Sequence, residues 1–170
     1  MTLPDSSLPP LSGYGRYPAT LTADQLHHYF RFDDQDRQAL TQKKGKHNRL
    51  GYALQLATVR FLGTFLSDPL DVPAPVLKYV AQQLELPENP TKLERYRRGE
   101  TRWDHRRDIQ VRYGYREFSE VSAFLGLARF LYARAHLLAE PPSRLLDLST
   151  ARLVERRVLL PGVTTLTRFI

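Results

Sequence analysis

The chain has 170 residues, of which 42% are hydrophobic, so it is long enough to bury a core as one domain or as two small ones. It contains no cysteine, which excludes a disulfide scaffold, a thiolate zinc site and a thiol nucleophile, and fits a reducing cytoplasm. Its net charge is +7, and two segments, 43–60 and 92–116, each have a balance of +5, while the remaining residues sum to −3. Positive charge confined to two patches favours a polyanion such as nucleic acid as the partner.

Residues 1–19 are predicted to form an extended N-terminal arm, because their prolines and glycines leave no regular apolar period. Asp5 stands where a secretion signal needs a basic end, so we do not expect export. The most apolar segments, 50–66 and 121–139, are interrupted by polar residues and fall short of the roughly 20 uninterrupted apolar residues of a membrane span. We therefore expect a cytoplasmic protein without a membrane partner.

Residues 20–86 are predicted to form a first helical subdomain. Thr22 and Gln25 have the spacing of a capping box at the start of a short helix. Three aspartates mark the start of a second helix, and a basic turn leads into the longest helix, 47–66, whose apolar residues recur every three or four positions. Pro75 suits the first turn of a fourth helix. The order of helix, glycine-containing turn and helix is that of a helix-turn-helix unit.

Residues 87–162 are predicted to form a second helical subdomain, which begins where prolines end the first one. Thr91 and Glu94 have capping-box spacing ahead of a short basic helix. Thr101 is expected to cap a helix that reaches Tyr113. This segment again gives the order of short helix, turn and helix.

A long helix is predicted from Ser119 to the prolines near residue 141, followed by a shorter helix over 149–158. The core-facing stripe of the long helix is expected to consist of Val121, Leu125, Ala128, Leu131, Ala135 and Leu138. Residues 163–170 are interpreted as the start of a connection to a downstream region. No apolar-polar alternation is bounded by turn residues, so the predicted fold class is all-α, a helical bundle with two helix-turn-helix-like units.

The first basic patch combines a turn with a helix start. Its candidate DNA contacts are Lys43, Lys44 and Lys46 on the turn and His47, Asn48 and Arg49 in the first helical residues. Phosphate recognition uses this geometry, because free backbone N–H groups at a helix start add to the lysine charge, and asparagine or arginine can contact base edges. The alternative is a solubilising surface loop.

The second basic patch lies on the helix from Thr101. Trp103, Arg106, Arg107 and Gln110 have a spacing that places them on one stripe, while His105, Ile109 and Tyr113 lie on the predicted core face. Arginine can pair bidentately with guanine and glutamine with adenine. The remaining candidate contacts are Arg95, Arg97, Arg98, Thr101, Arg102 and Arg112. The alternative is an ion-paired solvated face that includes Asp104 and Asp108, with Trp103 as a core anchor.

No catalytic or metal-binding residue is predicted. The five histidines have no ligand spacing, and the aspartates near residue 34 lack the glycine-turned loop of a calcium site. No glycine-rich phosphate loop or nucleophile elbow occurs. We therefore expect this segment to be no enzyme and to use no cofactor.

Six stretches of the chain form an ordered series of motifs, which is more specific than any one of them. They are residues 26–37, 48–63, 79–84, 101–105, 114–118 and 160–162. In that order they resemble the N-terminal region of the Tn3 family of replicative bacterial transposases. The resemblance covers nearly all of the chain from about Ala19 to Ile170.

The resemblance implies a helical region that precedes the catalytic part and binds the terminal inverted repeats of the transposon. It also implies that the parent polypeptide is a metal-dependent DDE-type transposase, whose ribonuclease-H-like domain and acidic triad lie far downstream. Nothing in this chain matches that triad. The expected partners are double-stranded DNA of the transposon ends and the rest of the transposase polypeptide. Whether the full-length protein forms a homodimer is a question that the sequence leaves open. The expected location is the bacterial cytoplasm, at the nucleoid.

The sequence leads to one hypothesis and two rivals. The hypothesis is a non-catalytic region that recognises a terminal inverted repeat through both subdomains. The first rival is a free-standing regulator that binds DNA or RNA, and the second is a protein-assembly module of the transposase.

Overall fold

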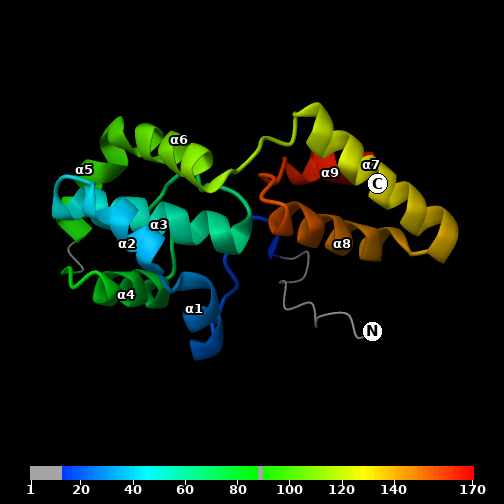
Figure 1. Ribbon diagram of the computed structural model, residues 1–170. Coiled ribbons are helices and arrows are strands. Elements are labelled where there is room, and N and C mark those ends of the chain that lie inside the picture. Colours follow the sequence, from blue (N-terminus) through cyan, green and yellow to red (C-terminus); the bar gives the residue numbers. More distant parts are fainter. Residues whose placement is uncertain (1–12, 88–89) are drawn as a thin grey trace. The chain divides into compact units, whose positions relative to one another are not determined.

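The computed structural model describes residues 13–87 and 90–170, and within them the fold is all-α, as predicted. The helices divide between two compact units, which we call the amino-terminal unit, residues 17–114, and the carboxy-terminal unit, residues 115–170 with the described residues 13–16. Their bounds are α1 Ala23–Phe30, α2 Asp34–Thr41, α3 Lys46–Leu62, α4 Ala74–Gln83, α5 Pro90–Arg98, α6 Thr101–Tyr113, α7 Val121–Leu138, α8 Pro142–Glu155 and α9 Val163–Phe169 (Figure 1). Of the helices described, none is long and apolar enough to cross a membrane.

The amino-terminal unit is built around α3, on which α1, α2, α4, α5 and α6 all pack. Every residue of α3 from 50 to 59 is buried, because the helix meets neighbours on all sides. The helix ends at Leu62 rather than at residue 66, because Gly63 adopts a φ of 71° and its N–H donates to the carbonyl of Val59.

The predicted starts of the first two helices are confirmed. The Thr22 hydroxyl accepts from the N–H of Gln25, and the Gln25 side chain accepts from the N–H of Thr22. Asp33 and Asp36 form the same reciprocal pair at the start of α2. Each pair satisfies two backbone N–H groups that would otherwise lack a partner at a helix start.

Of the caps predicted for α5 and α6, the structure tests the cap of α6. Glu100, not Thr101, occupies the cap position of α6, and no side chain caps this helix. The predicted capping by Thr101 is therefore wrong. The side chain of Thr91 lies outside the described residues.

Gly51 lets α5 pack closely on α3. A Cβ atom added at this glycine would overlap the buried ring of Tyr96 on α5. The Tyr96 hydroxyl accepts a hydrogen bond of 2.6 Å from the side chain of Gln55 on α3. Helices α5 and α6 therefore share the core of α1–α4, and the boundary expected between residues 86 and 87 falls inside the amino-terminal unit.

Residues 13–19 of the predicted arm are packed at two places. In the carboxy-terminal unit the Tyr14 hydroxyl donates to the carbonyl of Pro161 at 2.8 Å. In the amino-terminal unit the Tyr17 ring stacks on Phe61, with 5.6 Å between the ring centroids, and its hydroxyl pairs with that of Thr58. Residues 1–12 of the arm lie outside the described part of the chain.

The carboxy-terminal unit packs α7 on α8 and buries Leu166 of α9 in the same core. Helix α8 begins at Pro142, ahead of the predicted start at residue 149, because proline suits a first helical turn. Residues 163–170, expected to begin a connection, thus contribute a helix to this core.

The predicted core stripe of α7 is largely wrong. Of its members Leu131 is buried, whereas Val121 is 72% exposed and Leu125 is also exposed. The core side instead consists of Ala123, Leu127 and Leu131. Helix α7 is apolar on two sides, and a period of 3.6 residues alone does not decide which side meets α8.

Candidate nucleic-acid interface

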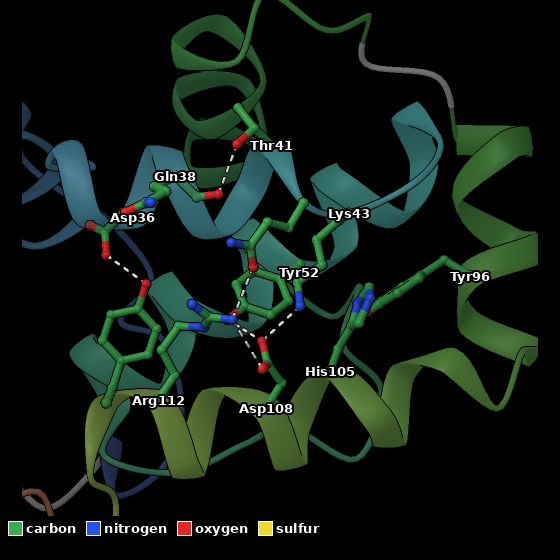
Figure 2. Close-up of polar contacts among 11 residues, drawn as sticks. Asp36, Gln38, Thr41, Lys43, Tyr52, Tyr96, His105, Asp108 and Arg112 are labelled. Atoms are coloured by element: carbon green, nitrogen blue, oxygen red, sulfur yellow. Dashed lines mark hydrogen bonds and ion pairs between the residues drawn. The ribbon is translucent and has the colours of Figure 1, made fainter.

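The two basic segments, far apart in the sequence, meet in the amino-terminal unit. The ammonium of Lys43 donates to Asp108 at 2.7 Å (Figure 2). The guanidinium of Arg112 donates to the side chain of Gln42 at 3.1 Å. These bonds hold the turn between α2 and α3 against α6. Both patches therefore lie on adjacent elements of one unit, and not one in each of two subdomains as expected.

Asp108 is the centre of this junction. Besides Lys43, it accepts a hydrogen bond of 2.8 Å from the Tyr52 hydroxyl and one of 3.4 Å from Arg112. Burial acts to raise the pKa of Asp108, but the hydrogen bonds from Lys43, Tyr52 and Arg112 outweigh it and lower this pKa to about 2. Lys43 is 14% exposed and also lies 4.3 Å from the centroid of the Tyr52 ring. Lys43 and Arg112 thus both pair with an acidic residue of the same unit. This matches the ion-paired alternative for Arg112, whereas the pairing of Lys43 differs from both expectations for the first patch, a DNA contact and a solubilising loop.

The remaining residues of the first patch surround the start of α3. Lys44 and Lys46 are exposed, and among the described residues neither forms an ion pair. Gly45 provides the turn with a φ of 87°, and the first turn of α3 has neither a side-chain cap nor an acidic residue. The side chain of Asn48 donates to the carbonyl of Lys44 at 2.9 Å, and His47 and Arg49 are half-buried. A helix start with uncapped N–H groups beside two exposed lysines is suited to a phosphate.

The exposed side of α6 carries the predicted stripe. Trp103 is 53% exposed, which excludes a core role for its ring, and Arg107 is exposed. The guanidinium of Arg106 lies 4.8 Å from the centroid of the Phe65 ring, and that of Arg102 lies 4.7 Å from the Trp103 ring. The opposite side, with His105, Ile109 and Tyr113, is buried as predicted. Gln110 is half-buried, and Thr101 is half-buried at the start of the helix.

The arginines of α5 have mixed surroundings. Arg97 pairs with Asp68 at 2.6 Å and with Glu94 at 3.0 Å, and Arg98 approaches Glu94 at 3.8 Å. Arg95 is exposed and forms no ion pair within the described residues. Of these three arginines, Arg95 is therefore the one whose positive charge is least offset by nearby acidic residues.

A buried polar chain fixes α5 and α6 on α3. The Gln55 side chain donates to the Tyr96 hydroxyl and, at 3.0 Å, to the carbonyl of Arg102. The Tyr96 hydroxyl lies 3.0 Å from Nδ1 of His105 (Figure 2). Burial, followed by the charge of Lys43, lowers the pKa of His105 to about 4. His105 is thus neutral at neutral pH and serves as a packed hydrogen-bonding group.

Two groups of residues in the carboxy-terminal unit were missed by the sequence reasoning. Arg116, Arg152 and Arg156 line one cleft. Helix α7 exposes large apolar residues, namely Val121, Phe124, Leu125, Tyr132, Leu137 and Leu138, of which Val121, Leu125 and Tyr132 share one outer side. The only pattern that could have indicated the cleft is the pair of arginines four residues apart in the predicted helix 149–158.

Comparison with known proteins places the chain in a family. A family model described as a domain of unknown function, DUF4158, matches residues 11–170. The transposase for transposon gamma-delta of Escherichia coli strain K12 is 46% identical over 158 residues, which is 92% of this chain and 16% of that protein. The transposase for transposon Tn1546 of Enterococcus faecium is 29% identical over 150 residues, 84% of this chain and 14% of that protein.

The chain spans about a sixth or less of the length of these relatives. The transposase for transposon Tn3926 of Escherichia coli is 37% identical over 98 residues, which is 56% of this chain. The chain therefore belongs to the DUF4158 family, whose domain it carries over nearly its whole length, and the proteins it is similar to are Tn3-family transposases.

Proposed function

We propose that this domain binds the terminal inverted repeats of a Tn3-type transposon, as a non-catalytic part of the transposase. The observation that carries the proposal is the junction at Asp108, which joins the two basic segments into one basic region of the amino-terminal unit. The similar proteins are transposases of named transposons, which supports duplex transposon DNA as the polyanion. Strand cleavage and joining would belong to the metal-dependent DDE domain elsewhere in the longer polypeptide, so we expect DNA binding here to need no divalent cation.

The two segments are proposed to have different roles. Lys44 and Lys46, beside the uncapped start of α3, would contact phosphates, because lysine is a flexible point charge. Arg106 and Arg107 on α6 would contact base edges, because the planar guanidinium can match the two acceptors of guanine. Trp103 would add contact area next to them. Lys43 and Arg112 would hold the segments together through Asp108.

Alanine variants test this division of roles. The double change of Lys44 and Lys46 to alanine should weaken repeat and scrambled duplexes by similar factors and flatten the slope of log K against log salt by up to about 2 units. The single change Arg107→Ala should cost about 1 to 3 kcal/mol on the repeat and less on the scrambled duplex. Fluorescence anisotropy over a salt series measures both effects.

Matched controls are available on the same unit. Lys78 and Arg31 are exposed and lie outside both basic segments, so Lys78→Ala and Arg31→Ala should leave the preference for the repeat unchanged. If Arg106→Ala and Arg107→Ala lose equal affinity for the repeat and for the scrambled duplex, α6 contacts only the DNA backbone. The residues at the start of α3 would then be the ones that recognise bases.

A second candidate function, assembly with the rest of the transposase, is favoured by the outer side of α7. Tyr132 is 69% exposed and lies on the same stripe as Val121 and Leu125. A helix face that exposes several large apolar side chains is typical of an interface. The occupant we propose is the remaining polypeptide of the transposase, since the gamma-delta relative is about six times as long as the matched region.

Charged substitutions on α7 test the assembly function. Leu125→Glu should leave the fold of the 170-residue chain intact, because the side chain is exposed, but should lower the melting temperature of the full-length transposase. Arg129→Glu, at an exposed position of the same helix, is the control and should have little effect. Equal melting temperatures for both full-length variants would contradict this function. Loss of self-association of the short chain in Leu125→Glu would instead identify a second copy as the occupant.

A further inference from the structure

The carboxy-terminal unit contains a cleft of about 260 Å³ that is lined by three arginines. Arg116 precedes α7, Arg152 lies in the last turn of α8, and Arg156 is the residue that directly follows this helix. The cleft belongs to the carboxy-terminal unit. Arg116 is the last residue of the second basic segment, but the candidate DNA contacts described above all lie in the amino-terminal unit.

The positive charge in this cleft is not neutralised by ion pairs. In the described part of the chain no carboxylate pairs with any of the three arginines; Arg116 donates to the Ser122 hydroxyl at 3.4 Å, and Arg152 lies 4.5 Å from the centroid of the Phe130 ring. Burial, and then the charge of Arg156, lowers the pKa of Arg152, while Glu155 acts in the opposite sense through space. Like charges four residues apart on a helix repel each other. A bound anion would relieve this repulsion.

The walls of the cleft are also suited to an anion. Ser122 and Ala123, in the first turn of α7, line it, and a helix start favours negative charge. Gly126 lines it as well, and a Cβ atom added there would meet nothing within 4 Å. The glycine therefore leaves open space between the arginines and α7.

From this geometry we propose that Arg116, Arg152 and Arg156 bind one phosphate group of the DNA backbone. The guanidinium fork donates two parallel hydrogen bonds to a phosphate, and three arginines that line one cleft can together bind one phosphate group. The carboxy-terminal unit thereby makes a second contact with the duplex, in addition to that of the amino-terminal unit. This inference rests on the proposed function, because that function identifies the phosphate as part of a DNA backbone.

Titration with inorganic phosphate tests the anion site without DNA. In ¹H–¹⁵N spectra of the arginine Nε–H groups, the signals of Arg152 and Arg156 should shift and saturate, while those of the exposed Arg129 and Arg144 should not. Gly126→Leu removes no charge but fills the open space, so it should abolish the saturable shifts while the circular dichroism stays helical. Absence of saturable shifts in the wild-type chain would overturn the inference.

Duplex binding tests whether the phosphate belongs to DNA. Changing both Arg152 and Arg156 to glutamine should weaken binding roughly tenfold and flatten the salt slope by about 1 unit. The matched control changes Arg129 and Arg144 to glutamine, which removes the same charge outside the cleft and should have a smaller effect.

The two experiments separate the possible failures. If phosphate binds but the cleft and control variants bind the duplex equally, the cleft is not a DNA contact and the inference is wrong. If the wild-type chain binds no duplex, the proposed function fails, and the source of phosphate in this inference fails with it. The phosphate titration would then still decide whether the three arginines form an anion site.

Discussion

Replacement of Arg60 by methionine is expected to lower the free energy of unfolding of the amino-terminal unit by about 3 to 5 kcal/mol. Arg60 forms two hydrogen bonds, of 2.7 and 2.6 Å, to the carboxylate of Asp36, which is fully buried. Tyr113 donates a third bond to the same carboxylate at 2.8 Å. Burial acts to raise the pKa of Asp36, but the hydrogen bonds and charge of Arg60 outweigh it and lower this pKa. Without Arg60 the carboxylate would remain buried with no cation.

Urea denaturation followed by tryptophan fluorescence measures this effect, because the single tryptophan, Trp103, lies on α6 of the same unit. Arg37→Met on the exposed side of α2 is the control and should change stability by less than about 0.5 kcal/mol. Combining Asp36→Asn with Arg60→Met should recover part of the loss, because the unpaired charge is gone. Equal stability of the Arg60→Met and Arg37→Met variants would contradict a structural role for the buried pair.

The second large effect is a loss of stability in mild acid, caused by His105. Its pKa is about 4 in the folded protein and about 6.5 in an unfolded chain, so between these values the unfolded state binds a proton that the folded state does not. The free energy of unfolding should therefore fall as the pH is lowered from about 6.5 to about 4, by up to about 3 kcal/mol in total. Above pH 6.5 both states are neutral at this residue, and His105 contributes no pH dependence.

Comparison of the wild-type chain with His105→Gln isolates this contribution. The variant should have a nearly flat stability profile between pH 6.5 and 5, a range in which few unfolded carboxylates gain protons. His136→Gln, at an exposed position of the carboxy-terminal unit, should keep the wild-type slope. The same slope in wild type and His105→Gln would show that His105 is not the responsible group.

The sequence predicted those parts of the fold that depend on neighbouring residues. The capping pair of Thr22 with Gln25 spans three residues, and the three aspartates that favour a helix start lie within four residues, so both predict the starts of α1 and α2 directly. The buried face of α6 was also predictable, because its apolar period is local to one helix.

The parts that depend on distant contacts could not be predicted. The bond between Lys43 and Asp108 joins residues 65 positions apart, and it decides that Lys43 is held inside the protein rather than exposed. The close approach of Tyr96 to Gly51 likewise decides that α5 shares the core of α3. In α7 both sides are apolar, so packing against α8 alone determines which side is buried.

The most direct measurement of the central claim compares two duplexes over a range of salt concentrations. One carries the terminal inverted repeat that is proposed as the partner, and the other is a scrambled duplex of equal length and composition. We expect the wild-type chain to bind the repeat about 1,000-fold more tightly at physiological salt, with log K falling by roughly 0.9 per phosphate contact as log salt rises. Equal affinity for the two duplexes, or binding that does not change with salt, would contradict the assignment of this domain to the recognition of transposon ends.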